Sequence, residues 1–177
     1  YGASKLAGEE AARAAFAARP GPQLAVVRTA WLFGPGRPDF PVKILEAARR
    51  ALDGRRPLQV VGDEWGSPTY VADLAEAIVE LLGAGTFAGI HHLVNGGVTT
   101  RAGWAADIVS RAGLPIELEE VPAATWPRAS DAPTWAVLEP TGSPSGERLR
   151  PWQEAMADYA PALLRTVGHS AGARSGR

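Results

Sequence analysis

Short apolar runs alternate along the chain with longer segments of helical period. The short runs are rich in valine, isoleucine and leucine, and they predict buried parallel strands at residues 24–29, 58–61, 90–94 and 116–121. The longer segments predict helices over residues 1–18, 42–52, 71–82, 100–112 and 152–167. This alternation of strand and helix indicates an α/β fold.

Three turn-rich segments interrupt the alternation. An aromatic loop, residues 31–36, follows the first strand, and a polar loop, residues 63–69, follows the second. In an open parallel sheet, ligands bind at the edge formed by the carboxyl ends of the strands, and the aromatic loop lies at this edge. The third segment, residues 122–146, is an irregular connection long enough to be functional or to cover a cleft.

Residue types within the helices refine the prediction. Thr69 and Thr100 are placed to cap the third and fourth helices. Apolar residues of the third helix share one face, which we expect to be buried; they are Val71, Leu74, Ala75, Ile78, Val79 and Leu82. The acidic residues Asp73, Glu76 and Glu80 are most simply a solvated face of the same helix.

Composition and charge exclude several classes of function. The formal net charge is −1 and the basic residues are scattered, so nucleic-acid binding is not expected. The chain has no cysteine, which excludes disulfides, thiolate zinc sites and cysteine nucleophiles. His91 and His92 adjoin in a strand and face opposite sides, so no metal site is predicted. Without a long apolar window or a leader segment, we expect a cytoplasmic protein with no membrane partner.

The sequence begins YGASK, which places a tyrosine and a lysine four residues apart in a predicted helix. Tyr1 and Lys5 therefore lie on the same face of that helix. A nearby ammonium favours the phenolate and lowers the pKa of the phenol, which makes the tyrosine usable as a general acid or base. Protonation of a carbonyl oxygen is what ketone reduction requires when a nicotinamide supplies the hydride. Taken alone, the spacing also fits an ordinary exposed helix pair.

Four blocks occur in order along the chain: YGASKLAGE, VVRTAWLFG, VVGDEWGSPTYVADLA and GIHHLVNGG. Together they resemble the carboxyl-terminal portion of the dTDP-4-dehydrorhamnose reductase family. Members of this family are extended short-chain dehydrogenase/reductases. The resemblance implies the carboxyl-terminal part of a Rossmann-like, doubly wound parallel sheet with a small substrate-binding α/β subdomain. We expect this unit to span residues 1–167 and to be followed by a flexible tail at residues 168–177.

The resemblance also implies roles for individual residues. Tyr1 would donate the proton, and Lys5 would hold the nicotinamide ribose and assist Tyr1. The backbone of Thr29 and Ala30 would approach the nicotinamide, and Trp31 would lie in the sugar-nucleotide site, although core packing is an alternative for this indole. The implied cofactor is NADPH or NADH, the implied substrate is a nucleotide sugar, and a homodimer is a further option.

Departures from the family pattern affect the expected substrate. Ala132 and Ala136 stand where the family has an arginine and a serine, and Glu64 replaces a glutamine. Loss of that arginine removes a bidentate anion contact, which Arg101 or Arg128 could supply instead. A reductase or epimerase acting on another nucleotide sugar therefore stays open, as does a non-catalytic binding or regulatory protein on the same scaffold.

A dinucleotide-binding fold needs a glycine-rich turn between its first strand and helix to hold the pyrophosphate. Gly83-Ala84-Gly85 and Gly34-Pro35-Gly36 occur in the wrong context for this turn. We therefore expect the cofactor-binding half to precede Tyr1 in a longer protein, and no dehydrogenase turnover from these residues alone. The intact mass of the native protein, compared with the 18.6 kDa of this sequence, tests that expectation.

Overall fold

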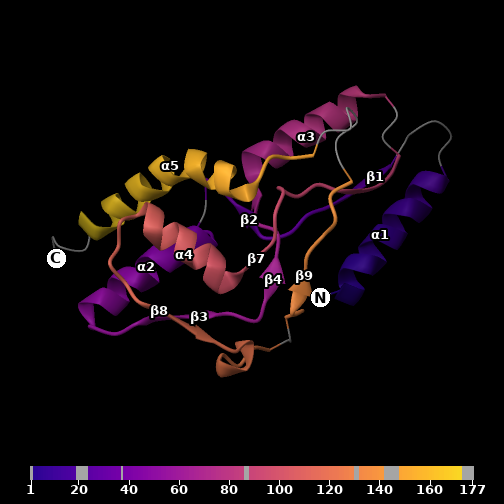
Figure 1. Cartoon of the computed structure of the whole chain (residues 1–177). Helices are drawn as coiled ribbons and strands as arrows, with labels where there is room; N and C mark the ends of the chain where they lie inside the picture. The colour runs from indigo at the N-terminus through magenta and orange to yellow at the C-terminus, as the bar shows by residue number, and fades with distance from the viewer. Residues whose placement is uncertain are drawn as a thin grey trace.

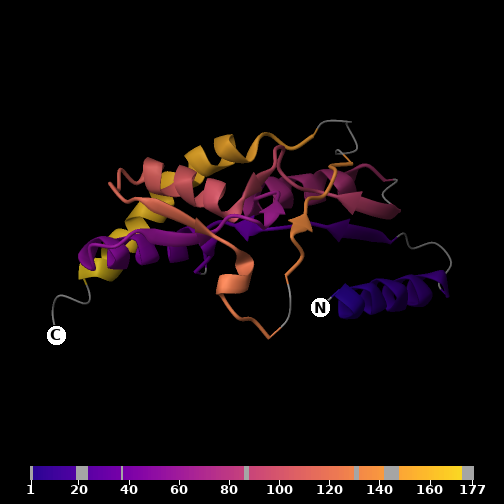
Figure 2. The same cartoon turned by 60° about the horizontal axis from the view of Figure 1, so that its bottom comes forward.

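The computed structural model describes residues 2–18, 24–36, 38–85, 88–129, 132–141 and 148–172, the last five without their side chains. At one end of the molecule, strands β1 (Ala25–Arg28) and β6 (Gly89–His92) form a parallel pair. Helix α1 (Gly2–Ala17) lies on one side of this pair and α3 (Val71–Gly83) lies on the other (Figures 1 and 2).

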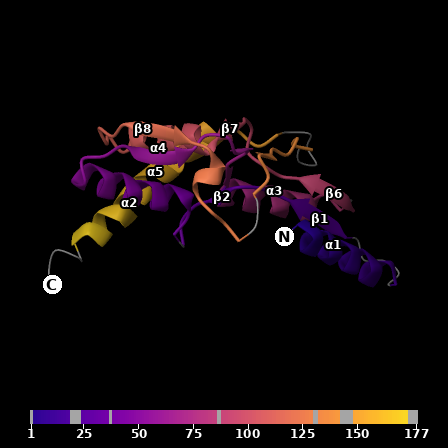
Figure 3. The same ribbon diagram turned by 90° about the horizontal axis from the view of Figure 1, so that it is seen from below.

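The other end of the molecule contains most of the hydrophobic core. Strands β3 (Leu58–Val61) and β8 (Leu118–Val121) pair in parallel. Three helices pack against one another beside them, as Figure 3 shows from below; they are α2 (Phe40–Asp53), α4 (Arg101–Arg111) and α5 (Trp152–Gly172). The buried side chains of this region include Phe33, Leu45, Trp104, Ile108, Met156 and Leu163.

In the described chain, five two-residue strands lie between the two ends. β2 (Leu32–Phe33) pairs in parallel with β5 (Thr69–Tyr70). β4 (Trp65–Gly66) lies between β7 (Thr99–Thr100), to which it is antiparallel, and β9 (Trp135–Ala136), to which it is parallel. A short 3-10 helix, η1 (Ala123–Thr125), precedes β9. These strands were not predicted, because two residues carry no periodicity and their partners are distant in sequence.

The predicted strands and helices are confirmed to within a few residues. Thr100 caps α4 by accepting a hydrogen bond from Gly103 N–H (2.9 Å). The predicted cap at Thr69 is wrong, because α3 begins after Tyr70 and has no side-chain cap. Thr69 is instead fully buried in β5, where its hydroxyl donates to the carbonyl of Ser67 (3.3 Å).

Two further expectations need correction. In α3 the buried residues are Ala77 and Leu81, whereas Val79 and Leu82 of the expected apolar face are exposed. The helix has apolar residues on more than one side, and the described residues bury only the side that carries Ala77 and Leu81. At the carboxyl end, α5 extends to Gly172, beyond the predicted helix end at residue 167, because each added helical residue gains a backbone hydrogen bond. The flexible tail stays a prediction.

Within the described ranges, every helix is too short or too polar to span a bilayer. In the same ranges, no three histidine or acidic side chains gather closely enough to bind a metal ion.

Candidate active site

Trp31 lies three residues beyond Arg28, the last residue of β1, and directly before β2. Its backbone has a positive φ of 47°, and its carbonyl accepts a hydrogen bond from Thr69 N–H (3.1 Å). The indole stacks on Trp104 with ring centroids 5.8 Å apart and planes 9° apart. The Arg101 guanidinium carbon lies 3.7 Å from the Trp31 ring centroid. Trp31 therefore packs against the core with part of its surface and contributes a half-buried aromatic surface with the rest.

Gly66 of β4 lies against the Trp31 indole. A β-carbon at this position would be 2.4 Å from Cε2 of Trp31 and 2.6 Å from its Cζ2. Only glycine leaves room for the ring, since these separations are far below a van der Waals contact. The glycine of the polar loop, which the sequence indicated only as part of a turn, therefore sets the position of the indole.

Replacing Gly66 with alanine is expected to displace Trp31 and to lower the free energy of unfolding by about 1–3 kcal/mol through overpacking. Urea denaturation measures the loss. Gly83→Ala is the matched control, because a β-carbon there meets no atom within 4 Å and should leave the stability nearly unchanged. Equal stability of the two variants would show that Trp31 accommodates the methyl group.

A buried carboxylate joins two arginines beside Trp31. Glu64 is buried, and its Oε1 accepts a hydrogen bond from Nη1 of Arg128 (2.6 Å). Its Oε2 lies 3.6 Å from Nε of Arg101. Burial lowers the pKa of Arg101 to about 10, an effect that Glu64 opposes, so the guanidinium remains cationic at neutral pH. These three residues form what we call the Glu64 cluster.

The Glu64 cluster lines a cavity of about 450 Å³ between α2, β3 and the segment after η1. Lys43 and Phe40 of α2 and Trp126 also line the cavity, as does Gln59 of β3. Its described lining thus combines three cationic side chains with one carboxylate and two aromatic rings. Such a lining suits an anionic ligand that also carries a flat ring.

Asp39 fixes the start of α2 beside this site. Its Oδ1 accepts a hydrogen bond from Val42 N–H and its Oδ2 accepts one from Gly34 N–H, both at 2.9 Å. The carboxylate therefore caps α2 and ties the aromatic loop to it. Burial, and then the nearby Asp39, raise the pKa of Tyr159, so this phenol stays protonated.

Thr29 and Ala30 lie between β1 and Trp31, at the carboxyl end of the strand. The Thr29 hydroxyl is buried and has no hydrogen-bond partner within the described residues. A buried hydroxyl without a partner is costly, and a bound group that hydrogen-bonds there would remove that cost. Thr29 and Ala30 therefore fit the approach of a ligand such as a nicotinamide.

Lys5 is exposed on α1, a helix that buries none of its described side chains. The helix contacts β1 through Glu9, whose two carboxylate oxygens accept hydrogen bonds from Nε (2.8 Å) and Nη2 (2.7 Å) of Arg28. The Arg28 guanidinium lowers the pKa of Glu9. Tyr1 lies outside the described residues, so the pairing of Tyr1 with Lys5 stays a prediction. The first turn of α1 faces the side of the molecule that carries β4 and β9 (Figure 1).

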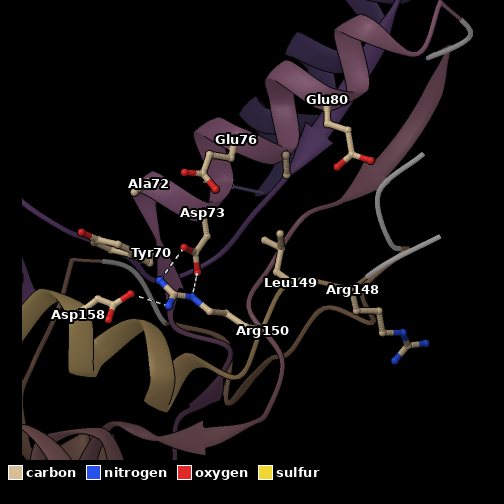
Figure 4. A pocket seen from close by; sticks show the side chains of 10 residues that line it. Tyr70, Ala72, Asp73, Glu76, Glu80, Arg148, Leu149, Arg150 and Asp158 are labelled. Atoms are coloured by element: carbon tan, nitrogen blue, oxygen red, sulfur yellow. Dashed lines mark hydrogen bonds and ion pairs between the residues drawn. The ribbon is translucent and has the colours of Figure 1, made fainter. Parts of the chain in front are cut away.

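A second cavity, of about 620 Å³, lies between α3 and the segment before α5 (Figure 4). Arg150 reaches across it, binding both oxygens of Asp73 (2.9 and 3.0 Å) and Oδ2 of Asp158. Asp73 was expected on a solvated helix face, and this expectation is wrong because Arg150 covers it. Asn95 is fully buried and donates to Asp73 (2.7 Å) and to the Arg150 carbonyl (2.9 Å). Through Arg150, these contacts hold α3 and α5 together, which is a structural role.

Asn95→Ala is expected to cost about 2–3 kcal/mol of unfolding free energy, because it leaves several buried polar groups without partners. Among these groups is Tyr70 N–H, which donates to Oδ1 of Asn95 (2.8 Å). Gln59→Ala removes an exposed amide bonded to Glu119 and should change the stability by about 0.5 kcal/mol or less. Similar losses in the two variants would contradict the role given to Asn95.

Comparison with known proteins agrees with this architecture. The family model of the RmlD substrate binding domain matches residues 1–164. A dTDP-4-dehydrorhamnose reductase of Mycobacterium tuberculosis is 39% identical over 162 residues, covering 89% of this chain and 50% of that protein. The spore coat polysaccharide biosynthesis protein SpsK of Bacillus subtilis is 32% identical over 160 residues, covering 90% of this chain and 53% of that protein.

Among solved structures, a dTDP-4-dehydrorhamnose reductase of Bacillus anthracis in complex with NADP aligns with a TM-score of 0.75 and 27% identity. The alignment covers 90% of this chain and 54% of that one. The chain therefore spans about half the length of the curated relatives that it matches. A match over nearly the whole chain, together with the strand and helix order described above, shows that the chain belongs to the RmlD substrate binding domain family.

Proposed function

We propose that this chain provides the substrate-binding part of an NADP-dependent reductase that converts a dTDP-linked 4-keto-6-deoxy sugar, dTDP-4-dehydrorhamnose, into dTDP-L-rhamnose. One observation carries the proposal: Trp31 stands at the carboxyl end of β1, beside a cavity lined by cations and aromatic rings. Membership of the family and the names of its relatives support the choice of reaction.

The residues of this chain divide the work between two ends of the substrate. Trp31 and the cavity hold the nucleotide sugar, while Thr29 and Ala30 line the place where the nicotinamide approaches. A nicotinamide bound there would supply the hydride for the carbonyl carbon. Tyr1 donates its phenolic proton to the carbonyl oxygen, which becomes the hydroxyl of the product, and Lys5 stabilises the resulting phenolate. A cytoplasmic location and a homodimer stay predictions.

The test is an assay of the full-length protein with dTDP-4-dehydrorhamnose and NADPH, followed by loss of NADPH absorbance and by the configuration of the sugar product. We expect NADPH consumption that depends on the sugar nucleotide. Turnover with UDP-linked but not dTDP-linked keto sugars would replace the proposed substrate. Binding of nucleotide sugar without any turnover would favour a non-catalytic role.

A further inference from the structure

The described lining of the cavity beside Trp31 carries more positive than negative charge. Glu64 pairs with both Arg101 and Arg128, so one anion faces two guanidinium groups. Lys43 adds a third cation to the described lining. Each guanidinium has five N–H donors, more than one carboxylate can accept from two arginines. Donors of the two arginines therefore remain to which an anionic ligand can bind.

The surroundings of Arg101 restrict where that anion can bind. Its guanidinium carbon lies 3.7 Å from the ring centroid of Trp31 and 5.0 Å from that of Phe40. A guanidinium in contact with aromatic rings keeps its N–H groups at its edge, where they can bind an anion in the plane. The side chain is three-quarters buried, so water provides little of the solvation that an exposed cation would have.

We propose that Arg101 and Arg128 bind the diphosphate of the nucleotide sugar, and that Glu64 is a positioning residue that orients both guanidinium groups toward it. This inference rests on the proposed function, because it assigns the ligand of the same site. Planar guanidinium groups bind phosphate oxygens in pairs, which a lysine does not reproduce. The aromatic rings of Phe40 and Trp126, which line the same cavity, then contact the base.

The cofactor also carries a pyrophosphate, so the experiment must separate the two sources. Calorimetric titration of the full-length protein with dTDP, thymidine and NADPH gives three dissociation constants for each variant. Arg128→Gln and Glu64→Ala, which remove one of the two guanidinium groups and the acceptor that orients them, are expected to raise the Kd of dTDP about 10- to 100-fold, as expected when a charged hydrogen bond is lost. The Kd values of thymidine and NADPH should stay unchanged.

Two further variants complete the design. Arg148→Gln is the matched control, since Arg148 is an exposed arginine whose ion pair with Glu139 lies outside this cavity, and it should leave all three constants unchanged. Arg128→Lys keeps the positive charge but lacks the planar guanidinium group, so its affinity for dTDP should lie between those of Arg128→Gln and the unaltered protein. A change in thymidine affinity equal to that of dTDP would show that the variant has merely disturbed the pocket and would overturn the inference.

The outcomes also separate this inference from the proposed reaction. Unchanged dTDP affinity in Arg128→Gln, in a protein that reduces the dTDP sugar, would overturn the diphosphate contact and leave the reaction standing. If the unaltered protein reduces no dTDP sugar and the variants bind dTDP more weakly, the diphosphate contact stands and the proposed reaction is overturned. A selective rise in the Kd of NADPH would assign the arginines to the cofactor, and failure of the unaltered protein to bind dTDP would end both proposals.

Discussion

Tyr1→Phe in the full-length protein is expected to lower kcat by about 10²- to 10⁴-fold, the usual contribution of a positioned general acid. Phenylalanine keeps the ring and removes only the proton that we assign to the carbonyl oxygen. The interaction lost is one that forms as the oxygen gains charge, so kcat and kcat/KM should fall by the same factor while KM changes little. Steady-state kinetics with the dTDP-linked keto sugar and NADPH measure both constants.

Lys5→Met provides the companion measurement. Lys5 is placed both to stabilise the phenolate and to bind the ribose, so its loss should lower kcat and also raise the Kd of NADPH. Tyr1→Phe should leave that Kd nearly unchanged. An unaltered kcat in Tyr1→Phe would remove the tyrosine from the mechanism, and an unaltered Kd in Lys5→Met would remove the ribose contact.

Trp104→Ala is expected to cause the largest loss of stability, about 3–5 kcal/mol, which is typical of a buried aromatic side chain cut back to alanine. Trp104 is fully buried, and its ring contacts Trp31, Phe33 and Phe40 with centroid separations of 5.8, 5.6 and 4.7 Å. A domain is usually stable by only about 5–15 kcal/mol, so this variant would be close to unfolding. The midpoint of urea denaturation gives the loss directly.

Trp135→Ala is the matched control for that measurement. Trp135 is 64% exposed and its ring contacts only Trp65 among the described aromatic residues, at 6.2 Å. The expected loss is about 1 kcal/mol, the contribution of a single aromatic pair. A loss at Trp104 as small as the loss at Trp135 would mean that the core repacks around the space left by the indole.

The regular elements were predictable because their signals are local. The apolar run at residues 58–61 matches β3, and the threonine before the fourth helix indeed caps α4 through Gly103. Periodicity and capping depend on neighbouring residues, which the sequence displays directly. The position of Trp31 after β1 could be predicted from the strand that precedes it. Its assignment to the sugar nucleotide rests on resemblance alone and stays a prediction.

The Glu64 cluster could not be predicted from local sequence signals. Glu64, Arg101 and Arg128 come from three segments that are distant in sequence, and each residue alone resembles ordinary surface charge. The register of β4 with β7 and β9 brings those segments together. The ion pair of Asp73 with Arg150 was missed for the same reason, since Arg150 is far along the chain. The buried side of α3 was misjudged because an apolar helix face does not identify its partner.

The two sides of the proposed chemistry are held in place by forces of different range. Packing of Trp31 against Trp104 and Gly66 is insensitive to dissolved ions. Helix α1, which carries Lys5, buries no described side chain and contacts β1 through the Glu9–Arg28 ion pair, in which the arginine side chain is 39% exposed. Mobile ions screen such a pair over about 8–10 Å at physiological ionic strength. Within the described chain, raising the ionic strength thus loosens the lysine side of the site while the tryptophan side keeps its shape.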